Sequence, residues 1–274
     1  MDDKYQTYLN RLARMTLPEA CRTQIQHIQE SSKFQPNSQG TRQAEPFPGY
    51  TVITPPWEEE TDNSTFYARL QSYQQELLQL SVNSDWIVLV PPASFHLTLA
   101  DLIWDSAYQD ACQKNPQFEE QLRSCIAEIF EQYQQSTQRQ THPIRWLLQG
   151  LVVMPRAVGV CLVPQDEACY EQIVNLRRAI YQNSNLMALG IEQHYHFTAH
   201  VTLGYFGEIS PSLDRDRLAT MFSELNQQWT ENSPELTIHR AELRKFDDMT
   251  RYYRQPNWPS LDFLKIFDQQ GKPL

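Results

Sequence analysis

The candidate catalytic side chains of this sequence lie in two copies of one short pattern. The pattern is His-x-Thr-Leu, and it occurs as His96-Leu97-Thr98-Leu99 and, 104 residues later, as His200-Val201-Thr202-Leu203. On an extended strand, residues i and i+2 point to the same face about 7 Å apart, so each copy presents one imidazole beside one hydroxyl. Two such pairs around one cleft would supply two acid/base groups and two hydroxyl donors, the set that a displacement at a phosphate needs.

A pattern this short also arises by chance, as His196-Phe197-Thr198 shows. Two copies that both continue into leucine, each in a strand-like context, are less expected from composition alone. The alternative is a pair of half-buried strands that each carry a structural histidine and share no site. The two interpretations differ in one geometric point, because only the first requires both copies to face the same cleft.

A second cluster of histidines precedes the second copy. His194, His196 and His200 would lie on one strand face at spacings that a metal ion could use. No accompanying Asp, Glu or Cys pattern completes a ligand set. Glu192 is the only nearby carboxylate that would lie on the same strand face as these histidines. We therefore predict no metal site and expect His194 and His196 to be partly solvated at the strand's edge.

Length and composition are those of a globular protein. The chain has 274 residues with a hydrophobic content of 41%, enough for one large domain or two small lobes. It has no apolar run of about 18 residues, and its first residues, MDDKYQTYLNRL, are polar and unlike a secretory signal. We expect a cytoplasmic protein that does not bind membranes.

Charge and cysteine content narrow the class further. A formal net charge of −10 argues against a broad groove for extended duplex nucleic acid, although a small nucleotide or an RNA end can still bind in a local pocket. The five cysteines are odd in number and lack CxxC spacing, which is typical of reduced thiols rather than of a zinc site. Neither GxxxxGK[ST] nor GxGxxG occurs. We expect a monomer without a cofactor.

The elements that must position the motifs follow from hydrophobic periodicity. Helices are predicted over residues 4–30 (with a restart at Pro18), 64–80, 118–133, 167–181 and 213–229. Strands are predicted over residues 50–54, 86–90, 95–99, 145–154, 157–163, 197–205, 235–246 and 251–253. The polar segment 31–49, with three prolines and two glycines, predicts a linker or surface loop.

The order of these elements indicates the fold class. Strand, helix, motif strand and helix follow one another twice, which predicts an α+β fold. In it, two antiparallel-leaning sheets are flanked by helices, and the motif strands meet across a central cleft. Residues 1–46 would then form an N-terminal helical extension and linker, and residues 47–274 a bilobal domain.

Paired HxTL motifs on strands about a hundred residues apart resemble the 2H phosphoesterase superfamily, over roughly residues 47–253. Its members include bacterial RNA 2′,3′-cyclic phosphodiesterases and plant cyclic nucleotide phosphodiesterases. The resemblance implies a bilobal α+β fold, a central cleft and metal-independent catalysis. It also implies that His96 and His200 act as acid and base, and that Thr98 and Thr202 hold the phosphate. Residues 1–46 lie outside the resemblance.

Aromatic residues near the motif strands could stack on a nucleobase, which is worth about 1–3 kcal/mol per base. The candidates are Phe95, Tyr205, Phe206, Tyr252 and Tyr253. Of these, we predict that Phe95, Tyr205 and Tyr253 bind substrate. Core packing is the alternative for each.

These observations favour a metal-independent phosphodiesterase that hydrolyses a small cyclic or terminal phosphodiester, such as a 2′,3′-cyclic nucleotide or RNA end. One imidazole would take a proton from water and the other would protonate the leaving oxygen. The sequence does not choose between them. The alternatives are a phosphodiesterase that cuts 2′–5′ links or trims RNA 3′ ends, and a non-catalytic module that binds a nucleotide in the same cleft.

Overall fold

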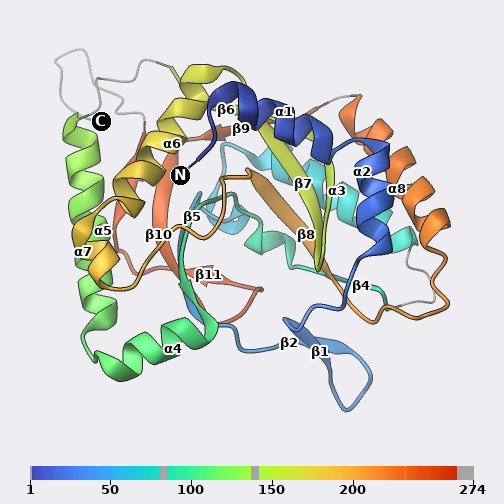
Figure 1. The fold of residues 1–274 in the computed structure, drawn as a ribbon, viewed down its shortest axis with the longest axis horizontal. Coiled ribbons are helices and arrows are strands. Elements are labelled where there is room, and N and C mark those ends of the chain that lie inside the picture. The colour runs from blue at the N-terminus through green and yellow to red at the C-terminus, as the bar shows by residue number, and fades with distance from the viewer. Residues whose placement is uncertain (1, 81–84, 137–141, 232, 264–274) are drawn as a thin grey trace.

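The computed structural model describes residues 2–80, 85–136, 142–231 and 233–263. Within these residues the chain forms eight α-helices, two five-stranded antiparallel sheets and a small two-stranded sheet (Figure 1). The predicted α+β class, with two antiparallel sheets flanked by helices around a cleft, is confirmed.

The helices and strands have the following bounds. The α-helices are α1 (Tyr5–Met15), α2 (Pro18–Gln26), α3 (Ser64–Leu80), α4 (Asp105–Lys114), α5 (Phe118–Ser136), α6 (Glu167–Tyr181), α7 (Ser184–Ala188) and α8 (Arg215–Thr230). The strands are β1 (Phe34–Pro36), β2 (Arg42–Ala44), β3 (Gly49–Ile53), β4 (Ile87–Leu89), β5 (Thr98–Trp104), β6 (Ile144–Met154), β7 (Ala157–Pro164), β8 (His200–Phe206), β9 (Glu235–Ile238), β10 (Arg240–Phe246), β11 (Tyr252–Tyr253) and β12 (Ser260–Asp262). Two short 3₁₀ helices span Trp57–Glu59 and Pro92–Ser94.

Each motif strand belongs to a different sheet. The first sheet, called sheet I, has the order β11-β10-β3-β5, with β12 also paired to β10, and contains the first motif strand, β5. The second, called sheet II, has the order β4-β8-β7-β6-β9 and contains the second motif strand, β8. Strand β5 lies at the edge of sheet I.

Local sequence explains where the main helices begin. Asp166 accepts a hydrogen bond from the backbone N–H of Cys169 and so caps α6, and Asp214 caps α8 in the same way. Pro18 occupies the first turn of α2, where its missing N–H costs nothing. The predicted helices over 64–80 and 167–181 are confirmed at both ends.

The N-terminal helices are part of the main hydrophobic core. Tyr8 and Leu12 of α1 and Ile25 of α2 are fully buried in the same cluster as the side chains of both sheets. Helix α1 packs on β6, β7 and α6, whereas α2 packs on β6 and α8, as the upper part of Figure 1 shows. Their burial ties residues 5–26 to sheet II.

Several element predictions need correction. Residues 31–49 are not only a linker, because β1 and β2 form an antiparallel hairpin there. The single strand predicted over 235–246 is two strands: β9 pairs with β6 in sheet II, whereas β10 pairs with β3 in sheet I. The second motif strand begins at His200 rather than at residue 197. Helix α4 directly follows β5 and was not predicted.

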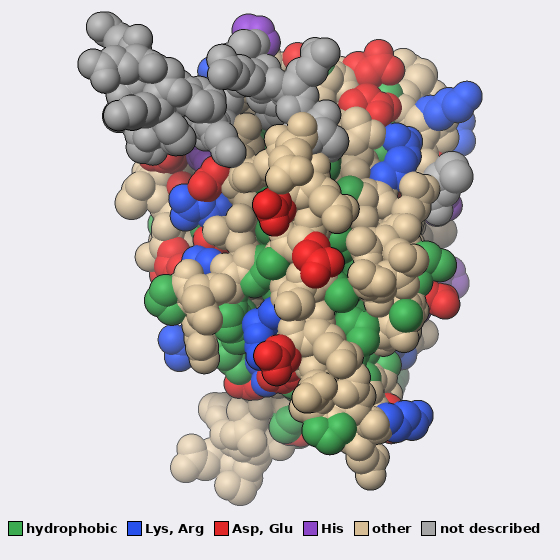
Figure 2. All heavy atoms as spheres, turned by 90° about the vertical axis from the view of Figure 1, so that its left-hand side faces the viewer, with side chains coloured by type: hydrophobic (Ala, Val, Ile, Leu, Met, Phe, Trp, Pro, Cys, Tyr) green, Lys and Arg blue, Asp and Glu red, His purple; other side chains and the backbone are tan. Residues whose placement is uncertain are grey.

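The surface carries charges of both signs. Figure 2 looks onto the left side of Figure 1, and on this face acidic and basic side chains are interspersed with neutral ones rather than gathered into a basic stripe. In the described part of the chain, no helix is both long enough and apolar enough to cross a membrane.

Candidate active site

A cavity of about 340 Å³ opens between β5 of sheet I and β8 of sheet II. His96 and Thr98 line it from the first copy of the motif, and His200 and Thr202 line it from the second. All four side chains are partly exposed. The structure therefore brings the four predicted residues into one solvent-reaching site.

His96 lies in an extended segment just before β5. The backbone of this segment is held by Thr54, whose Oγ1 accepts a hydrogen bond from Leu97 N–H and whose N–H donates to the Leu97 carbonyl. The His96 Nδ1 atom lies 2.7 Å from the carbonyl oxygen of Ser94. A carbonyl can only accept, so Nδ1 carries the hydrogen and Nε2 is the nitrogen left for chemistry.

His200 is oriented in the same way. Its Nδ1 lies 2.8 Å from the carbonyl oxygen of Thr198, again two residues earlier in the chain. The backbone on either side of His200 is fixed by sheet II, where His200 itself pairs with Cys161 of β7. Both motif imidazoles therefore keep Nε2 free, and neither needs a carboxylate to set its tautomer.

A β-bulge follows the threonine in each motif strand. The extra residue is Leu99 in β5 and Leu203 in β8, which is the same position of the pattern in both copies. A bulge shifts the alternation of side chains by one residue, so the next side chain toward the cavity is three positions after the threonine rather than two. These side chains are Asp101 and Tyr205, and both line the cavity.

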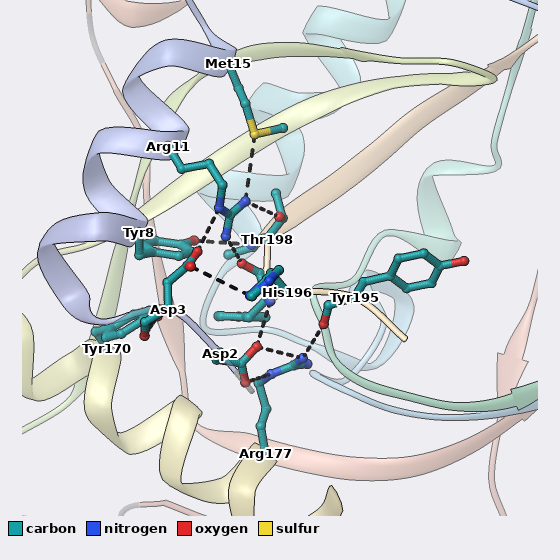
Figure 3. Close-up of polar contacts among 12 residues, drawn as sticks. Asp2, Asp3, Tyr8, Arg11, Met15, Tyr170, Arg177, Tyr195, His196 and Thr198 are labelled. Atoms are coloured by element: carbon teal, nitrogen blue, oxygen red, sulfur yellow. Dashed lines mark hydrogen bonds and ion pairs between the residues drawn. The ribbon is translucent and has the colours of Figure 1, made fainter. Parts of the chain in front are cut away.

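Helix α1 holds the segment that leads into His200 (Figure 3). The Arg11 guanidinium donates to the Thr198 hydroxyl at 2.7 Å and to the Phe197 carbonyl, while its Nε pairs with Asp3 at 2.8 Å. The Tyr8 hydroxyl accepts a hydrogen bond from the N–H of Ala199. Since the Thr198 carbonyl orients His200, these contacts connect α1 to the position of that imidazole.

Arg177 on α6 joins the N-terminal segment to both motif strands. Its side chain is 5% exposed and pairs with Asp2 at 2.7 Å. The same guanidinium donates to the carbonyl of Leu99 in β5 and to that of Tyr195, just before β8. Asp2 in turn accepts from the backbone N–H of Phe197. A buried ion pair that also satisfies backbone groups on both lobes fixes them relative to one another.

The electrostatic environment favours a neutral His96. Its imidazole packs against the Tyr252 ring, with 4.1 Å between the ring centroids. Burial lowers the pKa of His96 to about 4, and the charges of His200 and Arg244 act in the same direction, whereas the bond to the Ser94 carbonyl opposes them. The two imidazoles are therefore close enough to influence each other, and His96 is uncharged at neutral pH in the free protein.

Two further titratable groups belong to the cavity. Asp101 is exposed to the cavity but enclosed by the surrounding protein, which raises the pKa of its carboxyl, while the charges of His200, Arg177 and Lys33 oppose this shift. Burial lowers the pKa of Lys33 to about 8, with Asp101 and Asp105 opposing. The cavity thus combines acidic and basic groups rather than presenting one sign of charge.

The three aromatic residues predicted to bind substrate have different environments. Tyr205 and Phe95 line the cavity, whereas Tyr253 is not among its lining residues. Phe95 is only 1% exposed and stacks on Trp57, so it supports the cavity wall from within the core. The Tyr253 hydroxyl bonds to Asp247, and its neighbour Tyr252 lines the cavity instead.

Several lining residues were not predicted. They are Lys33, Phe47, Tyr50, Thr51, Val90, Ser94, Asp101, Trp104, Tyr195, Phe246 and Met249. Asp101 could have been found from its spacing to Thr98 only if the bulge had been foreseen. Lys33 had no sequence signal, because it lies in the polar segment assigned to a linker.

The placement of the histidine cluster before β8 was predicted wrongly. Residues 191–199 contain no strand, so His194 and His196 do not share a strand face with His200. His194 packs edge-on against Trp104, with 5.2 Å between ring centroids, and both His194 and His196 are exposed. Among the described residues, no three His, Cys, Asp or Glu side chains gather so that they could hold a metal ion.

Comparison with known proteins shows a family likeness for part of the chain. A family model named 2H-phosphodiest, described as a domain of unknown function (DUF1868), matches residues 33–156. The matched segment, less than half of the chain, is similar to a 2H phosphoesterase domain. The matched segment contains Lys33 and the first motif, and the second motif lies beyond it.

Three solved structures are similar to this chain, and the first of them shares its fold. The conserved protein of unknown function ATU0111 from Agrobacterium tumefaciens is 15% identical, with a TM-score of 0.57 over 86% of this chain and 94% of that chain. TT0787 of Thermus thermophilus is 16% identical, with a TM-score of 0.41 over 78% and 97% of the two chains. E. coli LigT complexed with 3′-AMP is 16% identical, with a TM-score of 0.39 over 79% and 99%. No curated protein matches the sequence.

Each copy of the motif, one on the sheet I side and one on the sheet II side, contributes one histidine and one threonine to the shared cavity. The two halves of the site repeat the imidazole, its carbonyl partner, the hydroxyl and the bulge. They differ in the next side chain toward the cavity, which is Asp101 in one half and Tyr205 in the other. The site is therefore symmetric at its reacting end and asymmetric beyond it.

Proposed function

We propose that this protein is a metal-independent phosphodiesterase that hydrolyses a small cyclic or terminal phosphodiester. The proposed substrate is a nucleoside 2′,3′-cyclic phosphate, free or at the end of an RNA. The observation that supports this is the presence of both imidazoles and both motif hydroxyls in one cavity, with each Nδ1 already engaged by a carbonyl. We further propose that it acts as a cytoplasmic monomer.

In the proposed reaction, water attacks the phosphorus in line with one ring oxygen. A new P–O bond forms as the ring P–O bond breaks, leaving a phosphomonoester and a free ribose hydroxyl. One imidazole accepts the proton of the water, and the other donates a proton to the departing oxygen. Exchange with solvent then restores both protonation states. Thr98 and Thr202 donate hydrogen bonds to the non-bridging oxygens, whose charge grows in the transition state.

We assign the base to His96 and the acid to His200. The environment of His96 lowers its pKa to about 4, so its Nε2 is free to accept a proton at neutral pH. A bound phosphate places a negative charge beside the ring and so raises this pKa, which makes His96 a stronger acceptor once the substrate is in place. His200, on the opposite wall, then protonates the leaving oxygen.

We also propose a role for the N-terminal extension, residues 1–46. Arg11 on its first helix, α1, donates hydrogen bonds to the Phe197 carbonyl and to the Thr198 hydroxyl. The Thr198 carbonyl in turn orients His200. On this proposal the extension is a positioning element of the active site, packed against the domain formed by residues 47–274.

The test is turnover of nucleoside 2′,3′-cyclic phosphates and short RNAs that end in one, using the full chain. His96→Asn and His200→Asn should each lower kcat by about 10²-fold or more, because each removes one proton-transfer partner. The double variant should lose much less than the product of the two effects. His27→Asn is the matched control, because His27 is exposed and lies outside the cavity.

Two outcomes would contradict the proposal. Unchanged turnover in both His96→Asn and His200→Asn would remove the catalytic assignment. If the wild type binds nucleotides without turning any of them over, and both variants lose that binding, the protein is a nucleotide-binding module instead.

A further inference from the structure

Lys33 places an ammonium group in the wall of the cavity. Its Nζ lies 4.4 Å from the ring centroid of Phe47 and 5.1 Å from that of Tyr205, so it sits against two aromatic faces. Within the described ranges of the chain, no carboxylate forms an ion pair with this Nζ and no oxygen accepts a hydrogen bond from it. The cation faces the cavity without a counter-ion in contact.

Removing water from an ammonium group costs free energy unless another group compensates its charge. An ammonium group that has lost most of its water needs hydrogen-bond acceptors, and ring faces replace them only in part. Consistent with this, burial lowers the pKa of Lys33 to about 8, although Asp101 and Asp105 oppose the shift at longer range. At neutral pH Lys33 remains mostly charged, so an anionic ligand would relieve this cost.

The position of Lys33 separates it from the reacting end of the cavity. It contacts Tyr205, which is three residues beyond Thr202 on β8, or about 10 Å along an extended strand. The same bulge that turns Tyr205 toward the cavity therefore builds the wall on which Lys33 rests. The motif residues and Lys33 can thus contact two ends of one ligand.

We propose that Lys33 is the anion-binding group of a second subsite in this cavity. It takes a phosphate on the 5′ side of the nucleoside whose 2′,3′ phosphodiester lies between the two motif copies. This inference rests on the proposed function, because the motif residues define where the first phosphate binds. It narrows the substrate class to nucleotides that carry a phosphate besides the one that reacts.

Asp101 makes this subsite selective, so that it does not bind every anion. Its carboxylate lies on the opposite strand, beyond Thr98, and its charge interacts with both Lys33 and His200. A carboxylate repels a phosphate that approaches it but accepts hydrogen bonds from hydroxyl or amino groups. A nucleoside with a phosphate at each end has hydroxyl and amino groups between the two phosphates. Because the charge of Asp101 interacts with both His200 and Lys33, its carboxylate is placed to accept hydrogen bonds from such groups.

A 5′ phosphate can belong to a free nucleotide or to the preceding residue of an RNA, and binding measurements distinguish these sources. We would titrate the full chain at pH 7 with adenosine 3′-phosphate, adenosine 3′,5′-bisphosphate and the dinucleotide ApAp, and record Kd by calorimetry. The wild type should bind one of the last two at least about tenfold more tightly than adenosine 3′-phosphate, as expected for a charge-assisted hydrogen bond. Preference for the bisphosphate identifies a free nucleotide, and preference for ApAp identifies an RNA end.

Three variants test the assignment to Lys33. Lys33→Met keeps the length of the side chain without its charge and should reduce the preference to less than about threefold. Lys33→Arg should retain the preference. Lys114→Met is the matched control, because Lys114 is an exposed lysine on α4 and should leave the preference unchanged.

The failures of the two proposals are distinguishable. If the wild type binds all three ligands equally, or if Lys33→Met keeps the preference and only lowers Tm, Lys33 serves packing and the subsite is overturned. If the preference is present but no cyclic phosphate is turned over, the proposed function fails and the Lys33 subsite stands.

Discussion

The Tyr252 ring covers the imidazole of His96, with 4.1 Å between the ring centroids and 55° between their planes. Tyr252 comes from β11 and His96 from the segment before β5, so both belong to the sheet I side of the cavity. The contact removes water from one face of the imidazole. Loss of water disfavours the imidazolium, and this is the main cause of the low pKa of His96.

Replacing Tyr252 should therefore change the titration of His96. In Tyr252→Leu, water reaches the imidazole more readily, and its pKa should rise from about 4 toward its ordinary value near 6.5. NMR titration of the imidazole C–H resonances measures this directly. Tyr253→Leu is the matched control, since Tyr253 is the next residue and does not line the cavity. Equal titration curves for the wild type and Tyr252→Leu would show that the ring does not control His96.

The low pKa of His96 also predicts how stability depends on pH. In the unfolded chain His96 binds a proton near pH 6.5, whereas in the folded protein it does so only near pH 4. Its contribution to stability is fully present above pH 6.5 and is lost as the pH falls toward 4, because only the unfolded state gains a proton in this window. The free energy of unfolding should fall by about 2–3 kcal/mol from this group alone.

Urea unfolding at pH 7.5 and 4.5 isolates this contribution when wild type and His96→Asn are compared. The variant lacks the titrating group, so its free energy of unfolding should decrease less over the same interval. Other groups titrate equally in both proteins and cancel in the difference. Parallel pH dependence of the two proteins would show that His96 protonates normally in the folded state.

Arg11 supplies a test of the connection between α1 and His200. Arg11→Met removes the donors to Phe197 and Thr198, so the carbonyl that orients His200 gains freedom. We expect kcat to fall by about tenfold with little change in KM, because the group that moves acts in proton transfer. Arg14→Met is the control on the same helix, since Arg14 is exposed and makes none of these contacts. Arg11→Lys should restore part of the loss, and an equal effect of Arg11→Met and Arg14→Met would point to general destabilisation.

The sequence predicted the reacting groups of the site better than the groups around them. The His-x-Thr spacing is local, and strand alternation alone puts both side chains on one face, so His96, Thr98, His200 and Thr202 could be identified without tertiary information. Asp101 could not, because the bulge at Leu99 reverses the alternation, and pairing with β3 creates that bulge. Lys33 depends on the path of a polar segment that joins α2 to β1, which periodicity does not describe.

The same reasoning explains the errors in the fold. Residues 235–246 have one continuous strand pattern, but His239 marks the point where the chain leaves sheet II and enters sheet I. Periodicity identifies strands but not the sheet to which they belong. The segment 191–199 has the aromatic residues of a strand, yet the N–H and carbonyl of Phe197 bond to the side chains of Asp2 and Arg11 instead of to a neighbouring strand.

Hydrolysis of the proposed substrate should survive removal of metal ions. The imidazoles of His96 and His200 provide both proton transfers, and two hydroxyls provide the donors to the phosphate, so the proposed mechanism requires no Lewis acid. Turnover of a 2′,3′-cyclic nucleotide should be the same before and after dialysis against EDTA. If activity is lost and zinc or manganese restores it, the proposed mechanism is wrong and a metal must be placed in the cavity.

The two motif threonines should contribute to catalysis more modestly than the histidines and through their hydroxyls alone. Thr98→Val and Thr202→Val keep the shape of the side chain and remove one donor to the phosphate, which should cost about 2–4 kcal/mol or less of transition-state stabilisation. Thr98→Ser and Thr202→Ser keep the donor and should retain most of the activity. The comparison is made on kcat/KM at a pH where the wild type is fully active, with Tm measured for each variant. If the serine variants lose as much activity as the valine variants, the methyl groups matter through packing and the hydroxyls do not bind the phosphate.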